Sequence, residues 1–177
     1  YWLAGWRNER AIRELLDLLT ATSSEDRVFA AERLAALPPG CVPVTESLRQ
    51  SLFDHVDTVR IHAALAIWNS TRNAESLVPV LRQILNSNNT RDVFNAARAL
   101  IRIGMPAIDA LPDLLSLRDS EDWHVQLQAV RALSHFDCPD HQARLILKSF
   151  KDHPNGTLQA FVSTEWKRRG FEQENEE

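Results

Sequence analysis

The chain has 177 residues, of which 44% are hydrophobic and 25% are charged, and its formal net charge is −4. This composition is too apolar for a disordered protein, and no run approaches the roughly 20 consecutive apolar residues of a transmembrane helix. The negative charge argues against a general affinity for nucleic acids. The wide separation of the two cysteines, Cys41 and Cys138, argues against a disulfide framework or a structural zinc site.

One pattern recurs along the chain every 33 residues. It places a leucine column at Leu15, Leu48, Leu81, Leu114 and Leu147. A second column holds small or β-branched residues at Ala30, Ala63, Ala96, Ala129 and Val162. A fixed period of this length is typical of arrays whose units bury their apolar faces against their neighbours. We therefore predict five units, at residues 7–39, 40–72, 73–105, 106–138 and 139–171.

Each unit is predicted to form two helices. The first helix has apolar residues at helical spacing, as at Ile12, Leu15, Leu16 and Leu19. A polar stretch follows, whose Ser, Asp and Thr residues suit the N-cap of a second helix beginning near residue 25, 58, 91, 121 or 156. Strand-like alternation is absent from the sequence. The predicted fold class is therefore all-α, a repeat array of helix pairs.

The two ends of the chain differ from the units. Gly104 ends one unit, and Gly5 lies three repeats earlier, so residues 1–6 are interpreted as the tail of a preceding repeat. Trp2 and Trp6 are expected to cover an interface with upstream repeats or domains of the same parent chain. Residues 172–177 are interpreted as an acidic tail. The chain is thus expected to be a fragment of a larger protein.

The central units resemble the HEAT-repeat family, particularly its short bacterial form, the PBS-lyase type. Residues 57–67, "DTVRIHAALAI", are close to the family pattern Asp-x-x-Val-Arg-x-x-Ala-Ala-x-Ala-Leu, and Pro79 and Pro112 align in first helices. The Thr-Pro-Leu-His turn of ankyrin repeats and the aromatic positions of tetratricopeptide repeats are missing. The resemblance implies a right-handed α-α superhelix whose second helices line a concave surface.

No catalytic motif is visible in the sequence. It contains no glycine-rich phosphate loop, no HExxH helix and no Gly-x-Ser-x-Gly elbow. It also lacks the His-Glu pairs with which HEAT-like deoxyhypusine hydroxylases hold iron, and nothing identifies the site of a bilin lyase. His124 and His135 are about three helical turns apart, which is too far for one metal ion. We predict no catalytic, cofactor-binding or metal-binding residue and no enzymatic activity.

Basic residues collect on the predicted inner face of the last three second helices. This face carries no acidic residue, and its candidate partner-binding residues are Arg91, Arg98, Arg102, His124, Arg131, His135 and Arg168. One interpretation is a surface for an anionic partner. The other is an inter-repeat ladder in which Arg98 and Arg131 pair with carboxylates such as Asp92 and Asp122. The sequence leaves both open.

Two tryptophans complete the candidate site. Trp68 is interpreted either as packing between repeats or as an exposed anchor, and Trp123 lies at the start of a second helix, where an aromatic residue is unexpected. The preferred function is a non-catalytic scaffold that binds a protein or peptide, including an acidic one, and no membrane. The alternatives are a DNA-binding or alkylpurine-glycosylase-like protein, with nucleic acid the less favoured partner, and a regulatory or spacer domain beside a catalytic domain.

Overall fold

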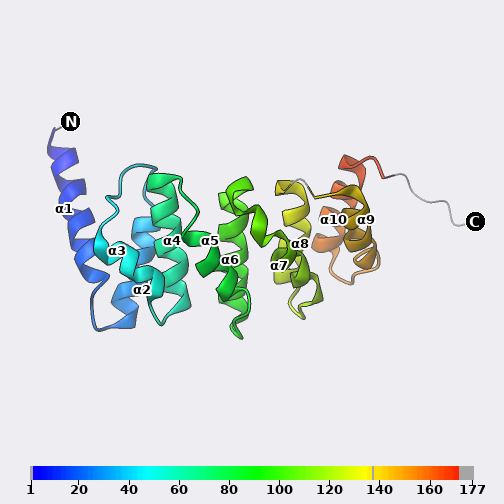
Figure 1. Cartoon of the computed structure of the whole chain (residues 1–177), viewed down its shortest axis with the longest axis horizontal. Helices are drawn as coiled ribbons and strands as arrows, with labels where there is room; N and C mark the ends of the chain where they lie inside the picture. Colours follow the sequence, from blue (N-terminus) through cyan, green and yellow to red (C-terminus); the bar gives the residue numbers. More distant parts are fainter. Residues whose placement is uncertain (1, 137, 172–177) are drawn as a thin grey trace, which may run out of the picture. The chain divides into compact units, whose positions relative to one another are not determined.

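Helices make up all of the regular secondary structure in the computed structural model, which describes residues 2–136 and 138–171, with side chains from residue 9 onward (Figure 1). The first helices of the pairs are α1 (Trp2–Leu18), α3 (Glu46–Gln50), α5 (Leu77–Ile84), α7 (Leu111–Ser116) and α9 (Asp140–Ser149). The second helices are α2 (Ser24–Ala35), α4 (Asp57–Thr71), α6 (Thr90–Ile103), α8 (Trp123–His135) and α10 (Gly156–Arg168). Each second helix begins 33 residues after the previous one, which confirms the predicted period.

The second helices begin where the polar stretches predict. Side-chain oxygens of Ser23, Asp122 and Asn155 accept backbone N–H groups in the first turns of α2, α8 and α10. At the other end of a helix, Gly104 follows α6 with φ of +73°, a conformation that favours glycine. Local side-chain chemistry therefore sets these boundaries.

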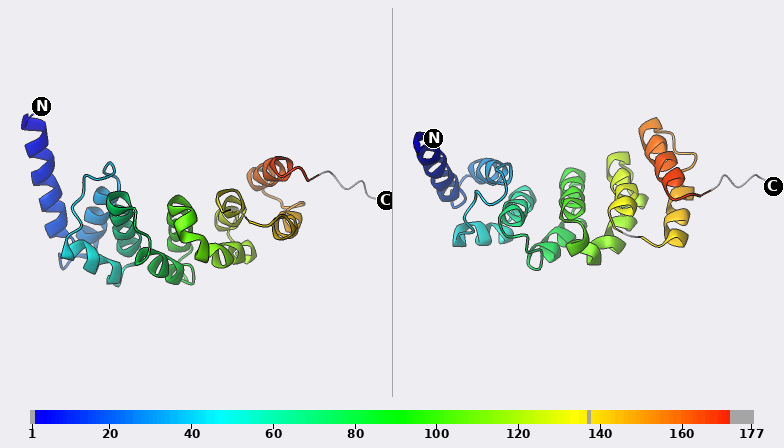
Figure 2. Two further views of the ribbon diagram at one scale, coloured as in Figure 1. Left: turned by 45° about the horizontal axis from the view of Figure 1, so that its top comes forward. Right: turned by 90° about the horizontal axis from the view of Figure 1, so that it is seen from above.

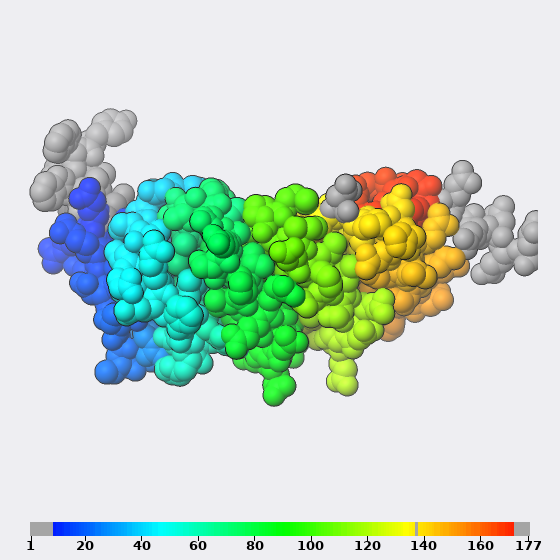
Figure 3. All heavy atoms as spheres, viewed as in Figure 1, coloured from blue at the N-terminus to red at the C-terminus, as the bar shows by residue number. Residues whose placement is uncertain are grey.

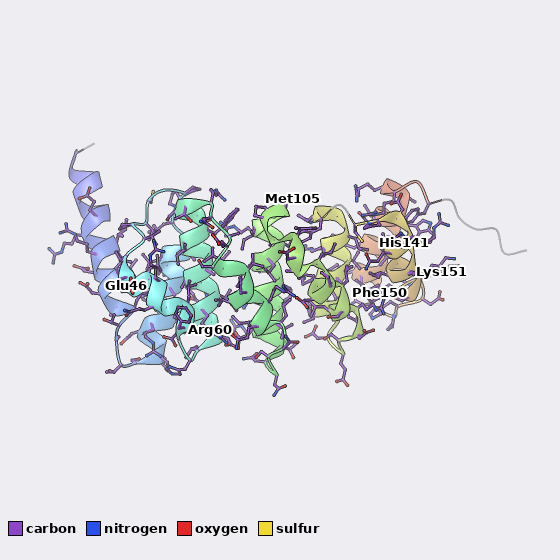
Figure 4. The ribbon with its side chains drawn as sticks, viewed as in Figure 1. Glu46, Arg60, Met105, His141, Phe150 and Lys151 are labelled. Atoms are coloured by element: carbon purple, nitrogen blue, oxygen red, sulfur yellow. The ribbon has the colours of Figure 1, made fainter. Side chains whose placement is uncertain are left out.

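The first helices are shorter and less regular than the second. Three 3-10 segments adjoin them: η1 (Ser51–Phe53), η2 (Met105–Ala110) and η3 (Leu117–Asp119). Met105 opens η2, while Phe150 and Lys151 directly follow α9 (Figure 4). Pro112 sits in the first turn of α7, where the missing N–H costs no intrahelical hydrogen bond.

The repeat columns form the core. Leu48, Leu81, Leu114 and Leu147 are fully buried, as are the alanines of the second column, Ala30, Ala63, Ala96 and Ala129. Small side chains let neighbouring second helices approach closely. The residues that recur every 33 positions therefore mark the buried side of each helix.

The chain divides into two compact parts, each larger than one repeat. They are Tyr1–Ala99, called unit 1, and Leu100–Glu177, called unit 2. In unit 1, α2 packs on α4, and the buried Asn69 donates from Nδ2 to the backbone carbonyl of Ala35 at 3.0 Å. Arg27 of α2 donates a hydrogen bond to Asp54, which lies just before α4, with Nε–Oδ2 at 2.7 Å. In unit 2, α8 packs against α7, α9 and α10 (Figure 2).

The first helix crosses the boundary that the sequence suggests. The predicted boundary after residue 6 is not a helix end, because α1 runs without interruption from Trp2 to Leu18. The predicted tail, residues 172–177, and the side chains of Trp2 and Trp6 lie outside the described residues. Within the described part of the chain, no helix combines the length and the apolar character needed to span a bilayer.

Candidate functional site

The predicted basic residues are on solvent-accessible sides of their helices. Arg91, Arg98, Arg102, His124, His135 and Arg168 are exposed, and Arg131 is half-buried. We call the set His124, Arg131, His135, Phe161 and Arg168, on α8 and α10, the basic face of unit 2. Arg91 and Arg98 belong to unit 1 and lie on α6.

On α6, the predicted pairing of Arg98 with Asp92 is wrong. Asp92 is buried and its Oδ1 accepts a hydrogen bond from the Thr58 hydroxyl at 2.9 Å, which links α6 to α4. The guanidinium of Arg98 instead lies over the ring of Phe94, 5.5 Å from its centroid, and forms no ion pair among the described residues. The polar contact between these two repeats is therefore the hydrogen bond between Thr58 and Asp92, not an ion pair.

On α8, the predicted pairing of Arg131 with Asp122 is also wrong. Asp122 caps α8 and contacts the ring of His124, with Oδ1–Nδ1 at 3.1 Å. Arg131 lies over the ring of Phe161 on α10, 5.3 Å from its centroid, and forms no ion pair within the described ranges. The ring accepts the positive charge from one side, and the guanidinium N–H groups are donors that can bind another acceptor.

Phe161 gives this face an apolar element. Its side chain is 40% exposed although it is a large aromatic residue on a regular helix. It occupies the same repeat column as the half-exposed Phe29 of α2. Unit 2 therefore presents an aromatic ring beside an arginine, a combination that is enriched in the centres of protein interfaces.

Gln128 lies beneath the basic face, one turn after His124. It is 1% exposed, and its Nε2 donates to the His124 carbonyl at 2.9 Å. Its buried Oε1 has no hydrogen-bond partner among the described residues. A buried acceptor without a donor is costly, so this oxygen is an open acceptor on the helix that carries the basic face.

The histidines and Trp123 extend the face to both ends of α8. Trp123, half-buried, stacks on His124 with ring centroids 3.7 Å apart and an interplanar angle of 29°. At the other end, Nδ1 of His135 lies 2.9 Å from the carbonyl oxygen of Arg131. These contacts fix both imidazoles close to the helix surface.

Trp68 is part of the core of unit 1 rather than an exposed anchor. Only 6% of its surface is accessible, and the guanidinium of Arg72 covers its ring at 5.3 Å. The partner-binding interpretation of Trp68 is therefore wrong, since a buried ring cannot contact a partner. Packing, the other interpretation, agrees with the structure.

A buried carboxylate fixes the C-terminal ends of α8 and α10, and the sequence analysis missed its role. Glu165 is 4% exposed and accepts hydrogen bonds from Arg168, Arg169 and Ser134. Burial alone raises the pKa of Glu165, but these hydrogen bonds outweigh it and lower the pKa to about 2. The signal in the sequence is a glutamate in a column that holds alanine in the three central units, at Ala66, Ala99 and Ala132, and Arg33 in the first.

Arg169 completes this arrangement. Its Nη1 donates to the Cys138 carbonyl and its Nη2 to the Leu133 carbonyl, so it satisfies oxygen atoms at and beyond the end of α8. In the space-filling view, α9 and the end of α10 lie against each other (Figure 3). The basic face is thus supported by a rigid set of charge-assisted hydrogen bonds.

The structure offers no competing metal site within the described residues. No group of three or more His, Cys, Asp and Glu side chains is close enough there to hold a metal ion. Cys41 and Cys138 are both free thiols, the first exposed and the second buried.

Comparisons with known proteins place this chain among helical repeat proteins. A family model of HEAT repeats matches residues 45–134 and 78–162. A crystal structure of an engineered protein is similar with a TM-score of 0.64 and 25% identity, over 88% of this chain and 77% of that one. A second engineered protein has a TM-score of 0.67 and 22% identity, over 87% and 78%.

A designed armadillo repeat protein in complex with the peptide (KR)4 is also similar, with a TM-score of 0.66 and 20% identity, over 86% of this chain and 79% of that one. No curated protein matches the chain. The HEAT-repeat matches together span more than half of the chain, and they agree with the 33-residue spacing of its second helices. The chain therefore belongs to the HEAT-repeat family.

Proposed function

We propose that the chain is a non-catalytic binding module, and that the basic face of unit 2 binds an acidic segment of a partner protein. The observation that carries the proposal is Arg131, whose guanidinium lies over the exposed ring of Phe161 and forms no ion pair among the described residues. Its N–H donors match the two oxygens of a carboxylate. The ring beside it suits an apolar side chain next to that carboxylate.

Several neighbouring features support an extended peptide as the partner. His124 lies about two turns before Arg131 on the same face of α8, His135 lies about one turn after it, and Arg168 is on α10. The orphan Oε1 of Gln128 is an acceptor that a backbone N–H of a bound segment can satisfy after a small side-chain movement. Repeat arrays present such residues from successive units to extended partners.

The designed armadillo repeat protein supports this class of partner, because it binds a peptide, (KR)4. That peptide is basic, whereas the face of unit 2 is basic itself, so charge complementarity favours a peptide of the opposite sign here. A role within a longer parent chain, as a regulatory domain beside a catalytic one, is compatible with the same surface.

A protein partner is favoured over DNA on electrostatic grounds. Phosphate backbones are bound by many lysines and arginines, whose number sets the salt dependence of binding. The face of unit 2 has two histidines and two arginines, of which Arg168 is already paired with Glu165, on a chain with a net charge of −4. These side chains can bind one or two carboxylates, but they are too few to neutralise many phosphates of a DNA duplex.

The test compares two charge reversals in the full chain. Arg131→Glu removes the central guanidinium, while Arg118→Glu makes the same charge change at an exposed position of η3, beside Asp119. The probe is a fluorescein-labelled peptide, Glu-Phe-Glu-Glu-Phe-Glu, followed by fluorescence anisotropy at low salt. We expect Arg131→Glu to weaken binding about tenfold, as the loss of a charged hydrogen bond implies, and Arg118→Glu to change it less than about twofold.

Equal weakening by both variants would mean that only net charge matters and would reject a defined site. A labelled DNA duplex provides the second probe. If the duplex binds more tightly than the peptide and its affinity falls steeply with salt, the DNA-binding alternative replaces the proposal.

A further inference from the structure

Three second helices of unit 1 run parallel in the order α2, α4 and α6, and α6 belongs to this unit up to Ala99 (Figure 1). Asn69, near the end of α4, donates to the carbonyl of Ala35 at the end of α2. Thr58, near the start of α4, donates to Asp92 near the start of α6. In each pair the two residues are 34 positions apart. Residues one or two repeats apart therefore lie at about the same level along these helices.

One solvent-accessible face of this row changes its charge from helix to helix. Positions spaced by four and then three residues share one side of a helix. On this side, each residue exposed or half-buried, lie Glu25, Phe29 and Glu32 of α2, Thr58, His62 and Leu65 of α4, and Arg91, Asn95 and Arg98 of α6. We call these nine residues the graded face of unit 1. It is acidic on α2, uncharged on α4 when His62 is neutral, and basic on α6.

The acidic end is available to a partner. Glu25 and Glu32 are exposed, and neither forms an ion pair in the described part of the chain. Between them the ring of Phe29 is 49% exposed, and the guanidinium of Arg33 lies over it, 5.2 Å from its centroid. The exposed Asp26 offsets the charge of Arg33. This end therefore offers two carboxylates beside an apolar ring.

The basic end is available in the same way. Arg91 and Arg98 are exposed, and neither is ion-paired with any residue that the structure describes. Asp92, the acidic residue of this helix, is buried and accepts from Thr58 instead. The two arginines follow the two glutamates at a distance of two repeats, 66 positions, so they lie at matching levels. The face thus carries equal and opposite charges at its two ends.

Such a face is complementary to itself under one two-fold rotation. If the axis runs parallel to the helices over α4, rotation exchanges the α2 and α6 ends and preserves the levels along the helices. Glu25 then faces Arg91 of a second copy. Glu32 faces Arg98 of that copy in the same way, and each pair occurs twice because the contact is isologous. An axis perpendicular to the helices would instead place α2 on α2, where like charges repel.

We propose that unit 1 binds unit 1 of a second copy of this chain through the graded face, as a symmetric dimer. The four carboxylate–guanidinium pairs set the orientation of the two copies, and the Phe29 ring adds apolar contact at both α2 ends. Exposed ion pairs contribute little each and are screened by salt, so the dimer is weak and salt-sensitive. The surface is separate from the basic face of unit 2, and this inference does not depend on the proposed function.

Sedimentation velocity of the full chain tests the dimer. At low salt, we expect the mass of wild type to rise from that of the monomer to twice that value between roughly 5 and 500 µM protein. About 0.5 M NaCl should return it to the monomer. A wild-type chain that stays monomeric at low salt over this range would overturn the inference. A mass that grows beyond the dimer would do the same, because an isologous contact closes after two copies.

Two charge reversals identify the surface. The acidic reversal carries Glu25→Lys and Glu32→Lys, and the basic reversal carries Arg91→Glu and Arg98→Glu. Each alone should lose the dimer, because it places like charges opposite each other. Mixed in equal amounts, the two variants should form a heterodimer, since all four pairs are restored with exchanged signs. Two variants that dimerise like wild type, or a mixture that stays monomeric, would contradict the assigned surface.

Arg131→Glu is the matched control in unit 2. It reverses the charge of an arginine outside the graded face, so its dimerisation should equal that of wild type. Loss of the dimer in this variant would mean that the basic face of unit 2 makes the contact, and would overturn the inference. Binding of the acidic peptide probe is measured separately, at a protein concentration below the onset of dimerisation, so the two proposals can fail independently.

Discussion

At the scale of single residues, Glu165 has a structural role that the sequence analysis does not predict. A carboxylate that follows three alanines in its repeat column suggests a decaying repeat, yet the structure buries it under two arginines and a serine. Its partners could not be predicted, because Arg169 lies just beyond α10 and its guanidinium also reaches the Leu133 carbonyl of another helix. Ser134 comes from a different repeat, and no local pattern connects the two.

Replacing Glu165 by glutamine tests this network. Glutamine keeps the shape but removes the charge, so Arg168 and Arg169 lose a charged acceptor, and the buried Arg169 side chain keeps only its other partners. We expect the free energy of unfolding to fall by about 1–3 kcal/mol, measured by urea denaturation. Glu121→Gln, at an exposed position before α8, is the matched control and should change it by less than about 0.5 kcal/mol. Equal effects of the two substitutions would contradict the assigned role.

At the scale of elements, the sequence predicts the second helices well and the first helices poorly. The predicted starts, near residues 25, 58, 91, 121 and 156, lie within two residues of the observed starts. An N-cap residue lies next to the start of its helix in the sequence, so the polar stretches predict where the second helices begin. The first helices are instead cut by 3-10 segments such as η2 and η3, whose bounds depend on packing within each unit rather than on local propensity.

The cap of α10 gives a test at this scale. Oδ1 of Asn155 accepts the backbone N–H of Leu158 at 3.0 Å. We expect Asn155→Ala to lower the free energy of unfolding by about 1 kcal/mol, because one N–H loses its acceptor. Asn155→Asp retains the acceptor and favours the positive end of the helix, so its stability in urea should match wild type. If alanine and aspartate give the same midpoint, the side chain does not cap α10.

At the scale of the whole molecule, the repeat period determines the fold, whereas the candidate site depends on contacts between repeats. The sequence predicts Arg131 as part of the basic stripe, but its ring partner Phe161 lies thirty residues later on another helix. The periodic pattern could not separate stacking on that ring from an ion pair with Asp122. Trp68 shows the same limit, since its burial follows from packing in unit 1 and not from its place in the repeat.

Each unit also contains a carboxylate whose ionisation is coupled to folding: Asp54 in unit 1 and Glu165 in unit 2. Burial raises the pKa of Asp54, but hydrogen bonds from Arg27 and the Val56 N–H outweigh it, and the pKa is lowered. For Glu165 the folded pKa is about 2, against an ordinary value of 4.5. A carboxylate with a lowered folded pKa stabilises the protein above its unfolded pKa, and this contribution is lost as the pH falls through the folded value.

The stability of the chain should therefore fall on acidification between about pH 4.5 and about pH 2, the window that Glu165 defines. Within it, the unfolded chain binds a proton at Glu165 that the folded chain does not. This difference adds up to about 1.4 kcal/mol per pH unit to the slope of the unfolding free energy. Glu165→Gln removes that contribution and leaves the one from Asp54, so its slope should be shallower than that of wild type but still positive. Urea denaturation of both chains across this window measures the two slopes, and parallel curves would show that Glu165 is not ionised at low pH in the folded protein.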